Sequence, residues 1–152
     1  MKRLLALVAV LILAPAAAAA GWPGPPRTAA PRLTQQGPPP AWVETRSRST
    51  WMAFSSYCWR TPRKAVCADA IPPQSRTDLP EMRVARGTLV RLHLGFRPRS
   101  AHLTVFRGVG FRHFVLAPRR VLAWRAATAG VASLDVRAGG GGASYLVRIT
   151  IR

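Results

Sequence analysis

Apolar and polar residues alternate along two clear stretches of the chain. In residues 88–96, apolar side chains occupy every second position from Val90 onward. Residues 145–152 repeat this pattern, beginning with Tyr145. A period of two places one face of a strand against a core and the other toward solvent. Both stretches are therefore predicted to be half-buried β-strands.

Six further short segments have strand character, and turn residues rich in Gly and Pro separate them. These segments are residues 50–58, 66–70, 101–106, 112–116, 121–126 and 131–136. No sustained 3.6-residue apolar stripe, the sign of an amphipathic helix, follows the first 20 residues. About eight short antiparallel strands in residues 42–152 predict an all-β domain, and a β-sandwich is favoured over a small barrel.

The first 20 residues have the layout of a secretory signal peptide. Lys2 and Arg3 precede an unbroken apolar run at residues 4–14, and small residues lead to a cleavage site near Ala20. The apolar run is shorter than the ~20 residues that span a bilayer, although a retained anchor is the alternative. We expect the protein to be secreted, either outside the cell or within the cell envelope.

Residues 21–41 are rich in proline and have no apolar periodicity. Such a sequence favours an extended polyproline conformation and lacks the pattern that packs against a core. We therefore predict a disordered linker, with Trp22 and Trp42 at its two ends. Docking of Trp42 on the adjacent domain is favoured over a recognition role.

Part of the chain resembles secreted bacterial immunoglobulin-like domains. The segment from Trp124 onward, with Gly130, an LDV motif at 134–136 and a final strand at 145–151, resembles their last two strands. The run at 86–92 is similar to their x-G-x-x-V-x-L strand entry. The two cysteines depart from the antibody pattern, because they are too close in sequence to bridge two sheets. The resemblance implies an immunoglobulin-like sandwich, a fold that carries many unrelated functions.

Cys58 and Cys67 are the only two cysteines. If the chain turns near Pro62, the two residues lie opposite each other in a hairpin, within reach of a disulfide. An exported protein with two cysteines so placed is expected to bridge them. A redox-active pair is disfavoured because it would have Cys-x-x-Cys spacing, and two thiols alone do not complete a zinc site.

The chain is strongly basic, with 23 Lys and Arg against five Asp and Glu and a net charge of +18. Cleavage of the signal would leave 21 basic and five acidic residues, a net charge of +16. All of these basic residues except Lys64 are arginines, a bias that GC-rich coding also produces. Such a charge attracts polyanions with an affinity that falls as salt rises. We therefore expect anionic envelope polymers, or another envelope protein, as partners.

Turn segments carry several of these basic residues, and together they could form an anion-binding surface at one end of the sandwich. We define this surface as the basic rim: Arg60, Arg63, Lys64, Arg97 and Arg99. Aromatic residues interleave with arginines nearby, a pattern that nucleic-acid and glycan binders use. A solvated arginine surface without a specific partner is the competing interpretation, and it is favoured on charge alone.

Two histidines are weak candidates for metal ligands. A hairpin centred on Arg97 and Pro98 would place His93 opposite His102. A stable site needs a third or fourth ligand, and the remaining histidine and the acids lie far apart in sequence. A metal-free surface pair is therefore favoured, and no metal or cofactor is predicted.

Motifs for catalysis are lacking. The sequence contains no Gly-x-Ser-x-Gly elbow, no His-Glu-x-x-His helix and no phosphate loop ending in Lys. We therefore expect no enzyme, but a non-catalytic interaction or adhesion module of the bacterial cell envelope. The alternatives are a secreted enzyme with a dispersed site and a small metal-binding protein that uses His93 and His102.

Overall fold

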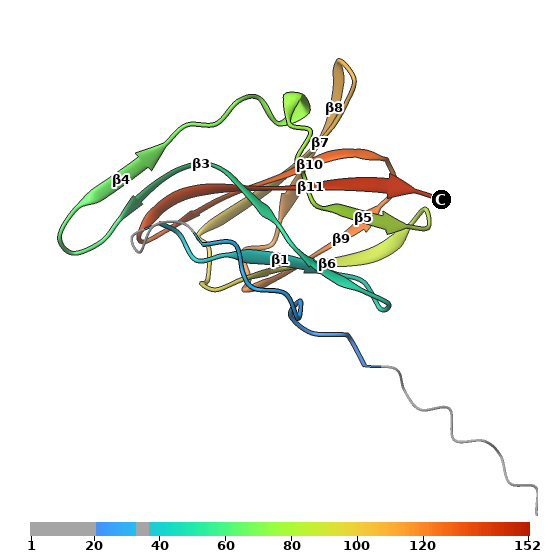
Figure 1. Ribbon diagram of the computed structural model, residues 1–152, viewed down its shortest axis with the longest axis horizontal. Coiled ribbons are helices and arrows are strands. Elements are labelled where there is room, and N and C mark those ends of the chain that lie inside the picture. The colour runs from blue at the N-terminus through green and yellow to red at the C-terminus, as the bar shows by residue number, and fades with distance from the viewer. Residues whose placement is uncertain (1–20, 33–36) are drawn as a thin grey trace, which may run out of the picture.

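Two β-sheets face each other across the main apolar core in this computed structural model, which describes residues 21–32 and 37–152 (Figure 1). The described residues form eleven strands and one 3-10 turn, η1 (Pro73–Ser75). The strands are β1 (Ala41–Glu44), β2 (Ser49–Trp51), β3 (Ala53–Arg60), β4 (Ala65–Ala68), β5 (Glu81–Val84), β6 (Thr88–Leu94), β7 (Ser100–Arg107), β8 (Gly110–Leu116), β9 (Val121–Ala126), β10 (Gly130–Ala138) and β11 (Gly141–Ile151).

The smaller sheet, called sheet A, has the strand order β2-β1-β6-β9. The larger one, sheet B, has the order β4-β3-β11-β10-β7-β8. Strand β5 completes sheet B by pairing with the last residues of β11, beyond the part that pairs with β3. This β5–β11 pair is parallel, whereas all the other strand pairs of the described residues are antiparallel.

The inward faces of both sheets supply the main core. In β6, Val90, Leu92 and Leu94 are buried, and in β11, Tyr145 and alternate residues after it are buried. The two stretches with the clearest alternation in sequence therefore form one strand in each sheet. Burying this apolar area, at about 25 cal/mol per Å², supplies the main favourable term for folding.

A second, smaller apolar cluster lies on the outer face of sheet B. It contains Val131 from β10, Leu146 from β11 and Leu79 from the connection between β4 and β5. Its presence explains why β11 has buried residues on both faces near its middle. The connection thus covers part of the outer face and leaves the rest of that face open.

The predicted all-β sandwich is confirmed, with differences in its strands. The predicted strand 50–58 is divided at the buried residue Met52, which joins β2 of sheet A to β3 of sheet B. The short strands β1 and β5 were not predicted, and the β5 pairing departs from the antiparallel prediction. The β1 sequence AWVE does not alternate, and the alternation of β5, EMRV, extends over only four residues.

The predicted pairing of His93 with His102 is wrong. Strand β6, which contains His93, belongs to sheet A, whereas β7, which contains His102, belongs to sheet B. The residues between them, 95–99, cross from one sheet to the other instead of forming a hairpin. Consecutive strands of a sandwich often change sheets in this way, which sequence periodicity alone does not reveal.

In the proline-rich segment, the described residues 21–32 and 37–40 form no strand, but the segment contacts the sandwich. The backbone N–H of Gly24 donates to Glu44, and the indole of Trp51 donates to the carbonyl oxygen of Thr28. The prediction of a disordered linker did not include these contacts. The predicted signal peptide, residues 1–20, lies outside the described residues. Within the described part of the chain, no helix has the length and apolar character needed to cross a membrane.

Candidate functional site

The predicted disulfide between Cys58 and Cys67 is present. The two residues are directly paired across strands β3 and β4, with Cα atoms 4.0 Å apart and sulfur atoms 2.11 Å apart. Strand β4 lies at the edge of sheet B, and its only strand neighbour among the described residues is β3. The disulfide therefore fixes the β3–β4 hairpin, which projects beyond the turn between β10 and β11 (Figure 1).

The basic rim draws on two segments at this end of the molecule. Arg60, Arg63 and Lys64 belong to the β3–β4 hairpin, and Arg97 and Arg99 belong to the connection between β6 and β7.

An aromatic contact joins these two segments directly, and both also contact the turn between β10 and β11. The rings of Trp59 and Phe96 have centroids 5.1 Å apart, which links the hairpin to the β6–β7 connection. The side chain of Arg99 lies beside Gly139 in the β10–β11 turn, and Arg60 donates a backbone hydrogen bond to Gly140 in the same turn. The rim residues therefore share one end of the sandwich, with the hairpin tip farther out than Arg99.

Carboxylate partners of the arginines are few. Among the described residues, the ion pairs formed by arginine join Arg76 to Asp78 and Arg83 to Glu81. In each pair the hydrogen bond from the arginine lowers the pKa of the carboxyl group. Neither pair involves a residue of the basic rim. The rim guanidinium groups are thus left to interact with solvent or an external anion.

The opposite end of the sandwich has a basic pocket that the sequence did not reveal. Arg86, Arg107 and Arg112 line a pocket of about 530 Å³, together with Phe111 and Ile151 and without any acidic residue. We call it the end pocket. Its arginines come from the β5–β6 turn and the β7–β8 hairpin, which are distant in sequence. Only the sheet topology brings these two turns together, so no local pattern could have predicted the pocket.

The outer face of sheet B has a polar groove that includes a serine, an aspartate and a histidine. The groove has a volume of about 670 Å³ and is lined by residues including Ser144, Asp135 and His102. Asp135 accepts hydrogen bonds from Ser144 and, over 3.3 Å, from Ser133. In a Ser-His-Asp triad the imidazole lies between the other two groups and takes the serine proton. Here the Asp135 carboxylate itself accepts the hydrogen bond from the Ser144 hydroxyl. The imidazole of His102 therefore does not lie between the two groups, where it could take the serine proton.

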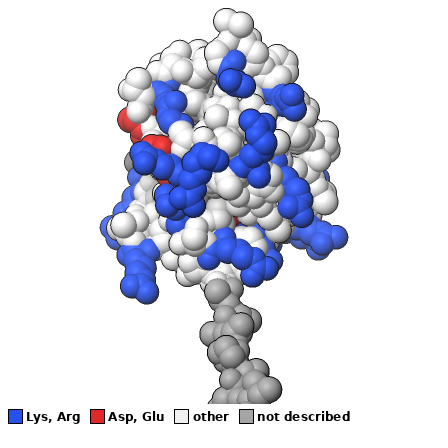
Figure 2. Space-filling model, turned by 90° about the vertical axis from the view of Figure 1, so that its right-hand side faces the viewer, with Lys and Arg blue, Asp and Glu red and all other residues white. Residues whose placement is uncertain are grey.

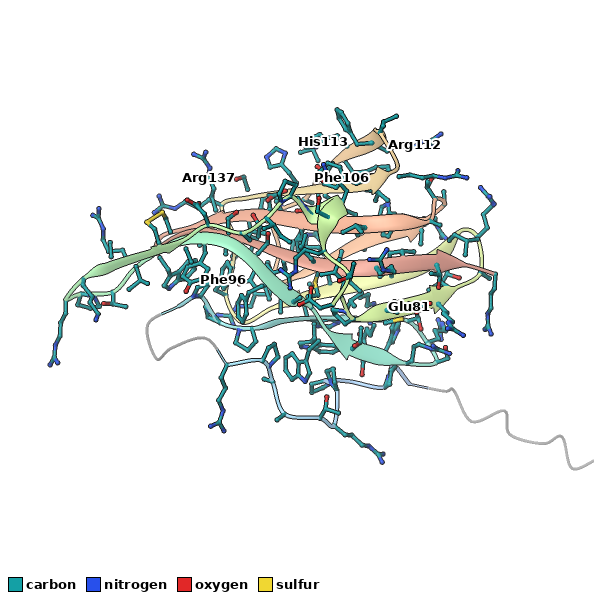
Figure 3. All side chains as sticks on the ribbon, turned by 45° about the horizontal axis from the view of Figure 1, so that its top comes forward. Glu81, Phe96, Phe106, Arg112, His113 and Arg137 are labelled. Carbon is teal, nitrogen blue, oxygen red and sulfur yellow. A yellow bond between two sulfur atoms is a disulfide. The ribbon has the colours of Figure 1, made fainter. Side chains whose placement is uncertain are left out.

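His102 has a different histidine partner from the predicted one. Its Nδ1 lies 3.2 Å from Nε2 of His113 on β8, and Nδ1 of His113 lies 3.1 Å from Oγ1 of Thr104. Figure 3 labels His113 on the β7–β8 hairpin. In the part of the chain that the structure describes, no three His, Cys, Asp or Glu side chains are grouped to hold a metal ion. The two imidazoles alone fall short of the ligand number of a stable site.

His93, the other metal candidate, lies in sheet A within a buried contact. Its Nε2 is 2.7 Å from Oε1 of Glu44, whose side chain is 2% exposed. Its ring stacks on Trp42 with centroids 3.7 Å apart. This arrangement satisfies a buried carboxylate and joins β1 to β6, which is a structural role.

Trp22, from the proline-rich segment, lies on the same sheet. The guanidinium carbon of Arg91 is 3.7 Å from the centroid of the Trp22 ring, close enough for a cation–π interaction.

Comparisons of the chain with protein families, curated proteins and solved structures gave no match.

Proposed function

We propose that this chain is an exported, non-catalytic module of the immunoglobulin-like β-sandwich class that binds anionic polymers of the bacterial cell envelope through the basic rim. The observation that carries the proposal is that five cationic side chains share one end of the sandwich, with no carboxylate partner among the described residues. Such a surface attracts phosphate, sulfate or carboxylate groups over several ångströms.

The shape of this end favours a long ligand over a small one. The β3–β4 hairpin projects from the body of the molecule, and Arg63 and Lys64 lie near its tip (Figure 1). Arg99 lies closer to the body, beside Gly139. Cations spaced along a projecting surface match the repeated charges of an extended polyanion. The disulfide supports the proposal because it holds the hairpin in its projecting conformation before binding, which lowers the entropic cost.

The side chains of the polar groove support the non-catalytic part of the proposal. Ser144 is bonded to Asp135, and the imidazole of His102 is bonded to another imidazole rather than to the serine. A hydroxyl held by a carboxylate without a neighbouring imidazole base is not a strong nucleophile.

Heparin affinity measured over a series of salt concentrations tests the proposal. The mature protein should bind at low salt, with an affinity that falls linearly on a log–log plot. Glutamine substitution of all five rim residues should weaken binding and flatten the slope. A matched variant with the same loss of charge at the other end serves as the control: Arg46, Arg86, Arg107, Arg112 and Arg152 to glutamine. This control should retain most of the binding and most of the slope.

Two results would contradict the proposal. Equal losses in the two variants would show that the rim binds the polyanion no better than the basic surface at the other end, and that it is not a distinct site. Absence of heparin binding by the unmodified protein at low salt would exclude polyanion binding altogether.

A further inference from the structure

The hairpin between β7 and β8 exposes apolar side chains at its tip. Val109, in the turn, is 110% exposed, and Phe111, at the start of β8, is 68% exposed. Gly108 has a φ of +56°, a left-handed conformation that lets the chain reverse tightly and present Val109 outward. The hairpin projects from the body of the sandwich at the top of Figure 1. Val109 and Phe111 lie two residues apart at this tip, and exposed apolar groups gathered in one patch mark interaction sites, whereas isolated ones do not.

Guanidinium groups surround the base of this tip. The end pocket lies there, lined by Arg86, Arg107 and Arg112. Arg86 is held in place by a 2.8 Å hydrogen bond from its guanidinium to the carbonyl oxygen of Ala127. Figure 3 labels Arg112 on the hairpin, and Figure 2 shows an uncharged tip at the top with Lys and Arg atoms spread over the face below it.

We propose that the β7–β8 hairpin docks on an anionic phospholipid bilayer. Val109 and Phe111 enter the boundary between headgroups and acyl chains, while Arg86, Arg107 and Arg112 contact the lipid phosphates. A bilayer has this layered chemistry, with anionic groups at its surface and hydrocarbon directly beneath. Peripheral binding of this kind combines apolar insertion with electrostatic attraction, and each component alone is weak.

The charge and shape of the surface favour a bilayer over a protein partner. The end pocket has no acidic lining residue, so it complements a surface of one charge sign. The tip is a narrow projection with two exposed apolar side chains, too small for the ~800 Å² per partner of a stable protein interface. A fluid bilayer, into which individual side chains can insert, suits such a projection better than the rigid surface of a protein partner.

This inference goes beyond the proposed function, because the hairpin and the basic rim lie at different ends of the sandwich. Sedimentation with two kinds of vesicle tests it: phosphatidylcholine alone, and an equimolar mixture of phosphatidylcholine with phosphatidylglycerol. The mature protein should bind the mixed vesicles and not the neutral ones. The double variant Val109→Ser and Phe111→Ser should bind the mixed vesicles at least about tenfold more weakly, because it loses the apolar insertion.

A matched control removes two exposed apolar groups elsewhere. Ile71 is 56% exposed and Val121, at the start of β9, is 42% exposed, and neither belongs to the β7–β8 hairpin. The double variant Ile71→Ser and Val121→Ser should bind the mixed vesicles as well as the unmodified protein does. Thermal unfolding of both variants verifies that each is folded.

Heparin binding, measured in the same buffer, separates this inference from the proposed function. The tip variant should retain full heparin affinity, because its charges are unchanged. Undiminished vesicle binding by the tip variant, or an equal loss in the control variant, would overturn the docking proposal. Heparin binding by the unmodified protein without vesicle binding would refute only the docking proposal. If neither probe binds, both proposals fail.

Discussion

The hydroxyl of Tyr145 donates a 2.7 Å hydrogen bond to the carbonyl oxygen of Pro39, which precedes it by 106 residues. Tyr145 is fully buried on the inner face of β11 in sheet B, whereas Pro39 lies just before β1 of sheet A. The bond thus joins the proline-rich segment to the opposite sheet. Burial also raises the pKa of the Tyr145 phenol above its ordinary value.

Tyr145→Phe is expected to lower the free energy of unfolding by about 1 kcal/mol at neutral pH, because it removes this hydrogen bond and leaves the Pro39 carbonyl without its partner. Urea denaturation followed by tryptophan fluorescence measures the change. Tyr57→Phe, at a partly buried position on β3, is the matched control and should have a smaller effect. An equal loss in both variants would contradict a specific role for the Tyr145 bond.

The same tyrosine predicts a loss of stability at alkaline pH. An unfolded chain releases the phenolic proton near pH ~10, while the folded protein retains it because the pKa is raised. The contribution of Tyr145 to stability is therefore full below that pH and declines as the pH rises above it. We expect the Tyr145→Phe variant to lose less stability than the unmodified protein between neutral and strongly alkaline pH. Parallel pH profiles would contradict this assignment.

Reduction or removal of the disulfide should destabilise the protein without changing its fold. The loop closed by Cys58 and Cys67 is short, and its closure contributes about 2.5 kcal/mol in the chain-entropy model. Because β4 lies at a sheet edge, the double variant Cys58→Ala and Cys67→Ala should keep the far-UV spectrum of the sandwich. Intact-mass analysis of the protein, purified without reductant and then labelled at free thiols, should find no free thiol, and two labelled thiols would contradict the bridge.

The features that the sequence predicted correctly are those encoded locally. Alternation over at least seven residues predicted β6 and β11, and two cysteines in one short hairpin predicted their bridge. The sheet to which each strand belongs was not encoded in this way. The predicted pairing of His93 with His102 was wrong because the sequence of residues 95–99 does not distinguish a hairpin turn from a connection that crosses between sheets.

For the candidate sites too, features encoded by nearby residues were predicted, and features that depend on the sheet topology were not. Residues of the basic rim were predicted as a group because turn arginines stand out in a sequence, and each lies in or beside a short connection. The end pocket was missed because its arginines, at positions 86, 107 and 112, converge only through the folded sheets.

His93→Ala is expected to lower the free energy of unfolding by about 2–4 kcal/mol. The substitution removes the ring that stacks on Trp42 and leaves the buried carboxylate of Glu44 without its imidazole partner. His102→Ala is the control, because the hydrogen-bond partner of His102 is the exposed ring of His113, and the substitution should change stability by less than about 0.5 kcal/mol. Chemical denaturation of both variants at neutral pH makes the comparison, and similar losses would contradict a structural role for the His93 contact.

Two adjacent glycines at the start of β11 should differ sharply in their tolerance of alanine. Gly141 has a φ of +134°, and a Cβ atom there would collide with the carbonyl oxygen of Cys58 on the paired strand β3. Gly141→Ala is therefore expected to cost at least about 2 kcal/mol, from backbone strain and displacement of β3. At Gly142 the nearest atom to an added Cβ is 3.6 Å away, an ordinary contact. Gly142→Ala should be neutral, or stabilise the fold by up to about 1 kcal/mol, because alanine restricts the unfolded chain. Urea denaturation of the two variants tests the difference, and equal stabilities would show that the approach of β3 to β11 does not require glycine at position 141.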